Sequence, residues 1–292
     1  MSDYIIKKYE EGFIEEQVKV GTEAIKDWKY FGQTQAEQLK EAYSREDFDP
    51  ETRLYCFKDD KMVGFLTARV VEREDTKFGF LRLPFFLPEH EEVAELLFNE
   101  VVEVFKKKGV DNIRAEGSEV WGNTLDLIKK WNFREKETSF YTYELDLKDL
   151  KDLEVDETIE VVDFDFDKDL DQMVKIFIEE FSYTEEQAKQ NFETIKNFEG
   201  VYAHLIVKED DKIKGRALAY FTDDIKVAIN GYIYGEPNIQ KTLQKAIFEK
   251  SKEKEVERMQ MFFNPRNENT IPTYEEYGFK LGCKGIVFEK DI

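Results

Sequence analysis

Residues 58–64 read KDDKMVG, and residues 209–215 read EDDKIKG. The two stretches are offset by 151 residues (215 − 64), and each lies between two short apolar runs. Two short apolar runs around Asp-Asp-Lys predict a β-hairpin. The sequence therefore predicts the same hairpin in each half of the chain, as is typical of a duplicated unit.

A second pair of matching stretches follows in the same order. In the first half, NTL at residues 123–125 leads to WNF at residues 131–133. In the second half, NTI at residues 269–271 leads to YGF at residues 277–279, at an offset of 146 (279 − 133). Two matches in the same order at nearly the same offset predict a tandem duplication, with units at residues 1–147 and 148–292.

Each unit is predicted to contain two helices, three strands, a long helix, a strand, a short helix and a last strand. In the first unit we expect helices within residues 10–45, strands at 52–58, 62–71 and 77–86, a helix at 91–108, a strand at 111–116, a helix at 123–131 and a strand at 138–147. In the second we expect helices at 168–181 and 184–197, strands at 201–208, 212–221 and 225–234, a helix at 238–252, a strand at 257–263, a helix at 268–276 and a strand at 280–289. The predicted fold class is α/β (α+β), with two tandem units that each have a mostly antiparallel sheet flanked by helices.

The net charge of −21 is spread evenly along the chain, because a cut after Leu147 leaves −10 in the first part and −11 in the second. Such a surface repels phosphate backbones and anionic headgroups, so nucleic acids and membranes are not expected partners. It attracts cationic small molecules and basic peptides, although solubility explains the charge about as well. The oligomeric state is left open.

Targeting and metal-binding signals are absent from the sequence. It turns charged before any apolar stretch of signal-peptide length, and no run approaches the ~20 apolar residues that span a bilayer. Cys56 and Cys283 lie in different halves, and His90 and His204 have no cysteine pair nearby. We therefore expect a cytoplasmic protein without a metal site.

The order of elements resembles the GNAT superfamily of N-acetyltransferases. That family carries, near its C-terminal end, an Asn followed by Tyr seven residues later and by Gly-Phe eleven and twelve residues later. Asn267, Tyr274, Gly278 and Phe279 stand at this spacing. The two copies together cover nearly the whole chain, in a layout similar to that of mycothiol synthase. A shared layout alone does not identify the substrate.

The resemblance implies acetyl-CoA as co-substrate and a site in the second copy. Tyr274 resembles the family's general acid, which returns a proton to the departing thiolate; its alternative role is to pack a short helix on the sheet. The resemblance places the acetyl-CoA site at Tyr232, Ile233, Tyr234, Gly235, Asn238, Ile239, Gln240 and Asn267.

The cofactor loops depart from the family pattern in both copies. In the second copy, Asn238 and Gln240 occupy the two glycine positions, and Glu236 faces the expected phosphates. In the first copy, a shorter loop carries Glu89, Glu91 and Glu92, so we expect no coenzyme A binding there.

The first copy also lacks the family's acid. Ile128 stands at the position that corresponds to Tyr274, and Trp121 replaces the Asn. In the second copy, the nearest candidate for a general base is Glu236, followed by Glu257, and solvent exposure is the alternative for both.

Two functions remain open from the sequence. The first is an N-acyltransferase that moves an acetyl group from acetyl-CoA to an amine of an unknown small molecule or peptide. The second is a catalytically silent GNAT-fold pseudoenzyme that acts as a binding or scaffold module. The motif from Asn267 to Phe279 favours the first, and the altered loops favour the second.

Overall fold

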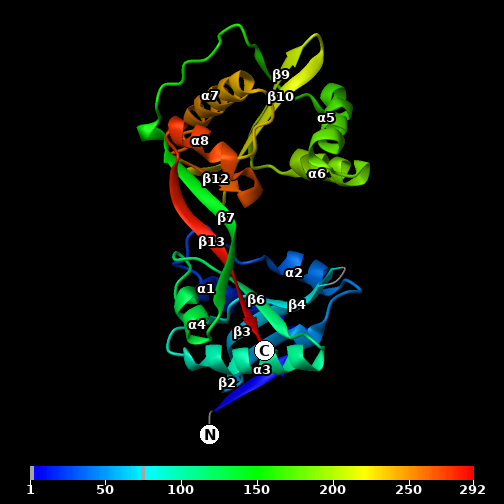
Figure 1. The fold of residues 1–292 in the computed structure, drawn as a ribbon, viewed down its shortest axis with the longest axis vertical. Helices are drawn as coiled ribbons and strands as arrows, with labels where there is room; N and C mark the ends of the chain where they lie inside the picture. Colours follow the sequence, from blue (N-terminus) through cyan, green and yellow to red (C-terminus); the bar gives the residue numbers. More distant parts are fainter. Residues whose placement is uncertain (1–2, 74–75) are drawn as a thin grey trace. The chain divides into compact units, whose positions relative to one another are not determined.

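The computed structural model describes residues 3–73 and 76–292 (Figure 1). It divides into two compact units. Unit 1 is Met1–Phe140 together with Cys283–Ile292, and unit 2 is Tyr141–Gly282. Each unit is a mixed α/β structure with a mostly antiparallel sheet, which confirms the predicted fold class.

Unit 1 is built around a sheet with the strand order β1-β2-β3-β4-β6-β13, and β5 pairs with β3. Its strands are β1 (Tyr4–Lys8), β2 (Arg53–Lys58), β3 (Lys61–Arg73), β4 (Thr76–Leu81), β5 (Phe85–Phe86), β6 (Asn112–Gly117), the first part of β7 (Arg134–Asp146) and the last part of β13 (Lys280–Asp291). Its helices are α1 (Ile14–Ala24), α2 (Ala36–Tyr43), α3 (Glu92–Lys107) and α4 (Thr124–Lys130), with a 3₁₀ turn η1 (Pro50–Thr52).

Both faces of this sheet are packed. Val20 and Ile25 at the α1 end pack on Tyr55, Phe57 and other residues of one face. The helices α3 and α4 pack on the opposite face. Along β2, the residues that point to this face alternate with those that point to the first face. The apolar periodicity that predicts the long helix therefore marks its buried side.

Unit 2 repeats this plan with the strand order β7-β12-β11-β10-β9-β8. Its strands are the last part of β7, β8 (Val161–Asp163), β9 (Val201–Glu209), β10 (Lys212–Phe221), β11 (Val227–Asn230) and β12 (Arg258–Phe263). Its helices are α5 (Phe166–Phe181), α6 (Glu185–Asn197), α7 (Pro237–Glu253) and α8 (Ile271–Tyr277), with 3₁₀ turns η2 (Leu147–Asp149) and η3 (Pro265–Thr270). In Figure 1, α5 and α6 lie on one side of β9 and β10, and α7 and α8 lie on the other.

The repeated sequence forms the same hairpin in both units. Asp59, Asp60, Asp210 and Asp211 all have φ between 48° and 61°, as a two-residue turn of the I′ type requires. Both hairpins have a register shift just before the repeated glycine, between Met62 and Gly64 in unit 1 and between Ile213 and Gly215 in unit 2. The duplicated signal thus encodes the turn and the bulge that follows it.

The repeated glycine lets the segment before the long helix cross the hairpin. In unit 1, a Cβ on Gly64 would lie 2.7 Å from the carbonyl oxygen of Phe85. In unit 2, a Cβ on Gly215 would lie 2.9 Å from Leu243 Cδ1 and 3.0 Å from the carbonyl oxygen of Tyr234, and would collide with Ile239. The long helix and the strand before it can approach the sheet only because no side chain stands there.

We therefore expect Gly215→Ala to lower the free energy of unfolding by about 1–3 kcal/mol, the usual cost of overpacking a core. Gly32→Ala is the matched control, because a Cβ there has no neighbour within 4 Å and the residue does not have positive φ. Urea unfolding of both variants measures the difference. Equal urea midpoints for the two variants would show that the close approach of the chain at residue 215 does not require glycine.

Each unit takes one strand segment from the other half of the sequence. Residues Ile286–Asp291 of β13 pair antiparallel with β6 of unit 1, and residues 141–146 of β7 pair with β12 of unit 2. In Figure 1 the red C-terminal strand lies among the blue and cyan elements. The division therefore differs from a single cut after Leu147, because each unit's sheet is completed by a segment beyond that cut.

Four features of the strands differ from the sequence-based prediction. The strands β1 and β8 were not predicted, since both are short edge strands. The strand expected at 77–86 is split into β4 and β5, because Pro84 lies between them and has no N–H for the ladder. The strand expected at 225–234 ends at Asn230, and this early end creates the candidate site.

Candidate functional site

The parallel strands β11 and β12 pair over three residues and then separate. Their last paired residues are Ile229 and Gln260. Beyond this point the chain after β11 turns toward β10, since the Gly231 N–H donates to the Leu218 carbonyl and Tyr234 forms a bridge with Arg216. The strand β12 instead continues along β7 to Phe263. The backbone of residues 231–233 therefore has no neighbouring strand on its β12 side.

Tyr274 lies buried beside this unpaired segment. It is on α8, is 3% exposed, and packs edge-on against Phe263 with ring centroids 5.2 Å apart. Burial is the main cause that raises the pKa of Tyr274, with Tyr277 and Tyr232 adding to it, while the backbone N–H of Ile233 faces the hydroxyl and acts in the opposite direction. The side chain is thus a neutral phenol whose hydroxyl points at the separation of the two strands.

The N-terminus of α7 follows the same segment. Gly235 has φ of +135°, and Glu236 is the exposed N-cap residue. Pro237 has no N–H, and the Ile239 N–H donates to Oδ1 of Asn238 at 2.9 Å. Two of the donors that a helix N-terminus offers to an anion are therefore missing or already engaged.

The structure places the other predicted residues in different surroundings. Ile233 and Ile239 are core residues, 1% and 4% exposed, and Gln240 is held by a 2.7 Å bond from its Nε2 to the carbonyl of Gly235. Tyr232 is 47% exposed. Asn267 is an exposed residue of η3.

Glu257 does not lie at the candidate site. It precedes β12, where its N–H donates to the Lys226 carbonyl and its carboxylate lies 3.7 Å from the Lys226 Nζ. This is the end of β12 opposite to the separation after Gln260. Glu236 therefore stays the better-placed acid of the two.

Residues at the end of α5 belong to the site but were missed by the sequence interpretation. The ring of Phe181 lies 5.9 Å from those of both Tyr232 and Tyr234. Burial raises the pKa of Tyr234, and the nearby carboxylates of Glu180 and Glu179 raise it further. The available signal was the acidic pair directly before Phe181 at the end of an amphipathic helix.

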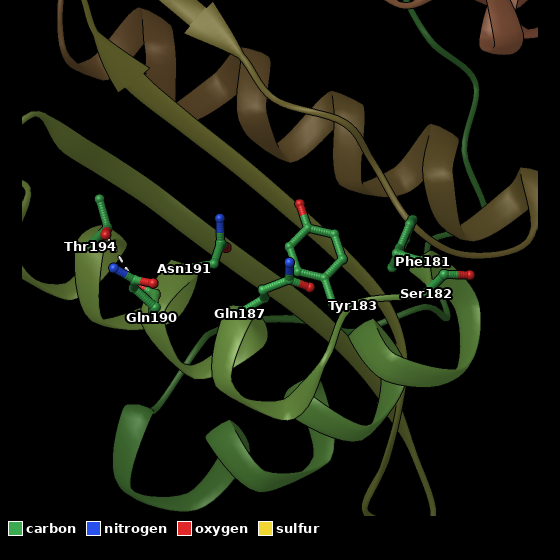
Figure 2. A pocket seen from close by; sticks show the side chains of 7 residues that line it. All are labelled: Phe181, Ser182, Tyr183, Gln187, Gln190, Asn191 and Thr194. Atoms are coloured by element: carbon green, nitrogen blue, oxygen red, sulfur yellow. Dashed lines mark hydrogen bonds between the residues drawn. The ribbon is translucent and has the colours of Figure 1, made fainter. Parts of the chain in front are cut away.

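A hollow of about 490 Å³ adjoins this aromatic group, between the end of α5 and α6. Figure 2 shows Tyr183, Gln187 and Asn191 projecting to the same side along its wall, with Phe181 at one end. Its lining is neutral, with amide and hydroxyl groups that donate and accept hydrogen bonds.

A buried arginine lies on the α5–α6 face of the same sheet. Arg216 is 7% exposed, lies over the rings of Phe177 and Phe192, and donates from Nε to His204 Nε2 at 2.9 Å. Burial lowers the pKa of Arg216 to about 10, and burial with the Arg216 charge lowers the pKa of His204 to about 3. His204 is therefore neutral and accepts the arginine's hydrogen bond.

The corresponding region of unit 1 has different contents. The strands β4 and β6 also separate, after Leu81 and Ala115, but Ile128 is a buried core residue where unit 2 has a tyrosine. The loop before α3 is a tight turn in which the His90 N–H donates to the Leu87 carbonyl at 3.2 Å, and Glu89 has φ of 68°.

The solved structures similar to this chain include several GNAT acetyltransferases. A tandem GNAT protein from the clavulanic acid biosynthesis pathway is 11% identical, with a TM-score of 0.68 over 99% of this chain and 98% of that one. A GCN5-related N-acetyltransferase from Sphaerobacter thermophilus is 13% identical, with a TM-score of 0.65 over 100% of this chain and 96% of that one. A GNAT-family acetyltransferase from Colwellia psychrerythraea is 14% identical, with a TM-score of 0.65 over 98% and 99%.

No protein-family model and no curated protein matches the sequence. At these low identities the likeness to solved structures defines the fold, and that fold is GNAT. The likeness extends over the full chain of a two-unit protein, so the chain has the tandem GNAT fold that the sequence motifs predicted.

Two further findings concern residues 3–73 and 76–292, the part of the chain that the structure describes. Within these residues, no group of three or more His, Cys, Asp or Glu side chains could hold a metal ion. None of the helices in this part of the chain is long and apolar enough to cross a membrane.

Proposed function

We propose that unit 2 is an N-acyltransferase of the GNAT type, which transfers an acetyl group from acetyl-CoA to an amine. The observation that carries this proposal is the buried phenol of Tyr274, which faces the Ile233 N–H where β11 and β12 separate. A proton donor and a backbone N–H on one unpaired edge are two of the groups that thioester aminolysis uses.

The reaction forms a C–N bond and breaks a C–S bond. The amine nitrogen attacks the thioester carbonyl, and the negative charge that develops on the carbonyl oxygen is stabilised by a backbone N–H donor of residues 232–233. When the C–S bond breaks, Tyr274 donates its proton to the thiolate, and the proton of the attacking amine leaves to a base. The raised pKa of Tyr274 keeps it protonated until that step.

An amine acceptor suits the charge around the α5 end. Glu179 and Glu180 are exposed and influence Tyr234, and the aromatic rings of Phe181 and Tyr232 stand beside them. Carboxylates and aromatic faces both attract an ammonium group. The acceptor in this proposal is therefore a cationic amine that approaches from the α5–α6 side of the sheet, past the hollow shown in Figure 2.

Glu236 is the base in this proposal. It is exposed at the N-cap of α7, directly after Gly235, where a carboxylate can take a proton from the acceptor ammonium through water. The same carboxylate stands near the expected phosphates of coenzyme A and weakens their binding.

We expect Glu236→Gln to tighten coenzyme A binding by roughly two- to fivefold, because it removes one exposed negative charge near the phosphates. Calorimetry without an acceptor amine measures this change separately from any effect on the base. Glu253→Gln is the control, since Glu253 is exposed at the opposite end of α7. Unchanged or weaker binding in Glu236→Gln would place the phosphates elsewhere.

A silent GNAT-fold binding module is the second candidate. Pro237 and the internal bond between Asn238 and Ile239 favour it, because they reduce the donors that a pyrophosphate needs. Release of free coenzyme A thiol from acetyl-CoA, followed with a panel of amines including polyamines and lysine-rich peptides, separates the two candidates. Amine-dependent release supports the acyltransferase, and binding of acetyl-CoA without release by any amine supports the binding module.

A further inference from the structure

Unit 1 holds a small aromatic cavity where β4 and β6 separate. The cavity has a volume of about 40 Å³. Most of its wall is aromatic or apolar, and Arg82, Glu116 and Thr124 complete it. The apolar and aromatic lining residues are Trp28, Phe31, Leu83, Phe85 and Trp121.

The aromatic wall is held in place by ring contacts and hydrogen bonds. Trp28 and Trp121 are nearly parallel, 7° apart with centroids at 6.2 Å, and Phe31 meets Trp121 edge-on at 4.8 Å. The indole N–H of Trp121 donates to the Lys29 carbonyl at 3.1 Å. The loop after α1 and the segment after β6 are therefore fixed to each other around the cavity, which does not depend on a mobile side chain.

Arg53, Arg69 and Arg82 lie near one another on one face of the sheet. Arg53 pairs with Thr67 on β3, and the Arg82 N–H donates to the Thr67 carbonyl, so these residues form one row across three strands. Arg69 is two residues further along β3 on the same face. In the part of the chain that the structure describes, Arg53, Arg69 and Arg82 form no ion pair, although the chain carries 64 acidic residues.

The guanidinium groups of Arg69 and Arg53 lie near that of Arg82: burial lowers the pKa of Arg82, their charges lower it further, and Glu116 acts in the opposite direction. Glu116 directly follows Ala115 and Arg82 directly follows Leu81, the last residues that pair between β6 and β4, and Glu116 is the one acidic side chain among the residues that line the cavity. Arg82 lies over the Phe31 ring at 5.6 Å and so reaches the cavity wall. Three guanidinium groups against one carboxylate repel a cation, so the aromatic cavity does not suit an ammonium group despite its rings.

We propose that this cavity binds a small organic carboxylate, whose short apolar tail enters between the aromatic rings and whose carboxylate pairs with Arg82. The guanidinium fork matches a carboxylate with two parallel hydrogen bonds. A volume of about 40 Å³ holds roughly three groups of the size of a water molecule or methyl group. The expected ligand is therefore of the size of acetate to butyrate, and the site is independent of acyl transfer in unit 2.

The test uses the full chain and the three indole N–H resonances in ¹⁵N-edited NMR spectra. Propionate is added, and propylammonium and propanol serve as ligands of the same size with opposite or no charge. Trp131 is an internal control, because it stacks on Phe98 at 3.9 Å and donates to Glu95, away from the cavity lining. We expect propionate to shift the Trp28 and Trp121 resonances saturably, and to leave that of Trp131 in place.

Two variants identify the carboxylate's partner. Arg82→Gln is expected to weaken propionate binding by about tenfold or more, since it removes a charge-assisted pair. Arg45→Gln, at an exposed arginine that pairs with Glu41, should change nothing. Any of three results would overturn the proposal. Propylammonium could cause shifts as large as those of propionate, or propionate could saturate Arg82→Gln at the same concentration as the unsubstituted chain. Propionate could also cause no shifts at 50-fold the concentration of the protein or above. The comparison of the three ligands needs no variant, so it decides the charge preference even if Arg82→Gln misfolds.

Discussion

Deletion of residues 283–292 is expected to unfold unit 1, although these residues are at the C-terminal end of the chain. The deletion removes the strand segment that pairs with β6 from Ile286↔Gly117 to Asp291↔Asn112. It also removes Ile286 and Phe288 from the core of unit 1. Loss of two such side chains costs about 5–10 kcal/mol, which is comparable to the whole stability of an ordinary domain of about 5–15 kcal/mol.

Hydrogen exchange of the amides measures this effect unit by unit. In the truncated chain we expect the amides of β6 and β4 to lose their protection while those of β9 and β10 keep it. A milder version compares Phe288→Ala with Phe262→Ala, since Phe288 is 9% exposed and Phe262 is 49% exposed. Full protection of β6 in the truncated chain would contradict the exchange of strand segments between the two halves of the sequence.

Tyr274→Phe is expected to lower turnover by about 10²–10³-fold while leaving coenzyme A binding nearly unchanged. The substitution removes the proton donor to the thiolate and keeps the ring that packs on Phe263. Tyr277→Phe is the matched control on the same helix, because Tyr277 is also buried and its hydroxyl does not face Ile233. Steady-state kinetics with saturating acetyl-CoA measure both variants.

The pH dependence gives a second readout of the same group. Burial raises the pKa of Tyr274, so the protonated, donating form persists to higher pH than in an ordinary phenol with a pKa near 10. Activity should therefore not fall through the range in which an exposed tyrosine ionises. An equal loss of turnover in Tyr274→Phe and Tyr277→Phe would assign Tyr274 a packing role.

The sequence predicted the fold because the duplicated signals are local. The Asp-Asp turn sets φ near +50° to +60°, and the glycine after it admits the strand before the long helix. Both features act within a few residues, so they can be recognised in the sequence without knowledge of tertiary contacts. The Asn-Tyr-Gly-Phe spacing similarly fixes one face of α8 and the turn after it, where Gly278 has φ of +108°.

The exchange of strand segments could not be predicted in this way. The strands β7 and β13 are continuous, and nothing in their local sequence marks where the pairing passes from one unit to the other. The same holds for the acids at the end of α5, which reach Tyr234 only through the packing of α5 on the sheet. The aromatic cavity of unit 1 likewise depends on residues 28–31 and 116–124, which the fold brings together from distant parts of the sequence.

An NMR titration of the full chain with acetyl-CoA tests the central claim most directly, because amide shifts report where the ligand binds. The proposed function predicts shifts at residues 231–240 and at the amides around Tyr274, with residues 86–92 of unit 1 unchanged. Shifts confined to residues 86–100, or the absence of shifts at millimolar acetyl-CoA, would contradict an acyl-transfer site in unit 2.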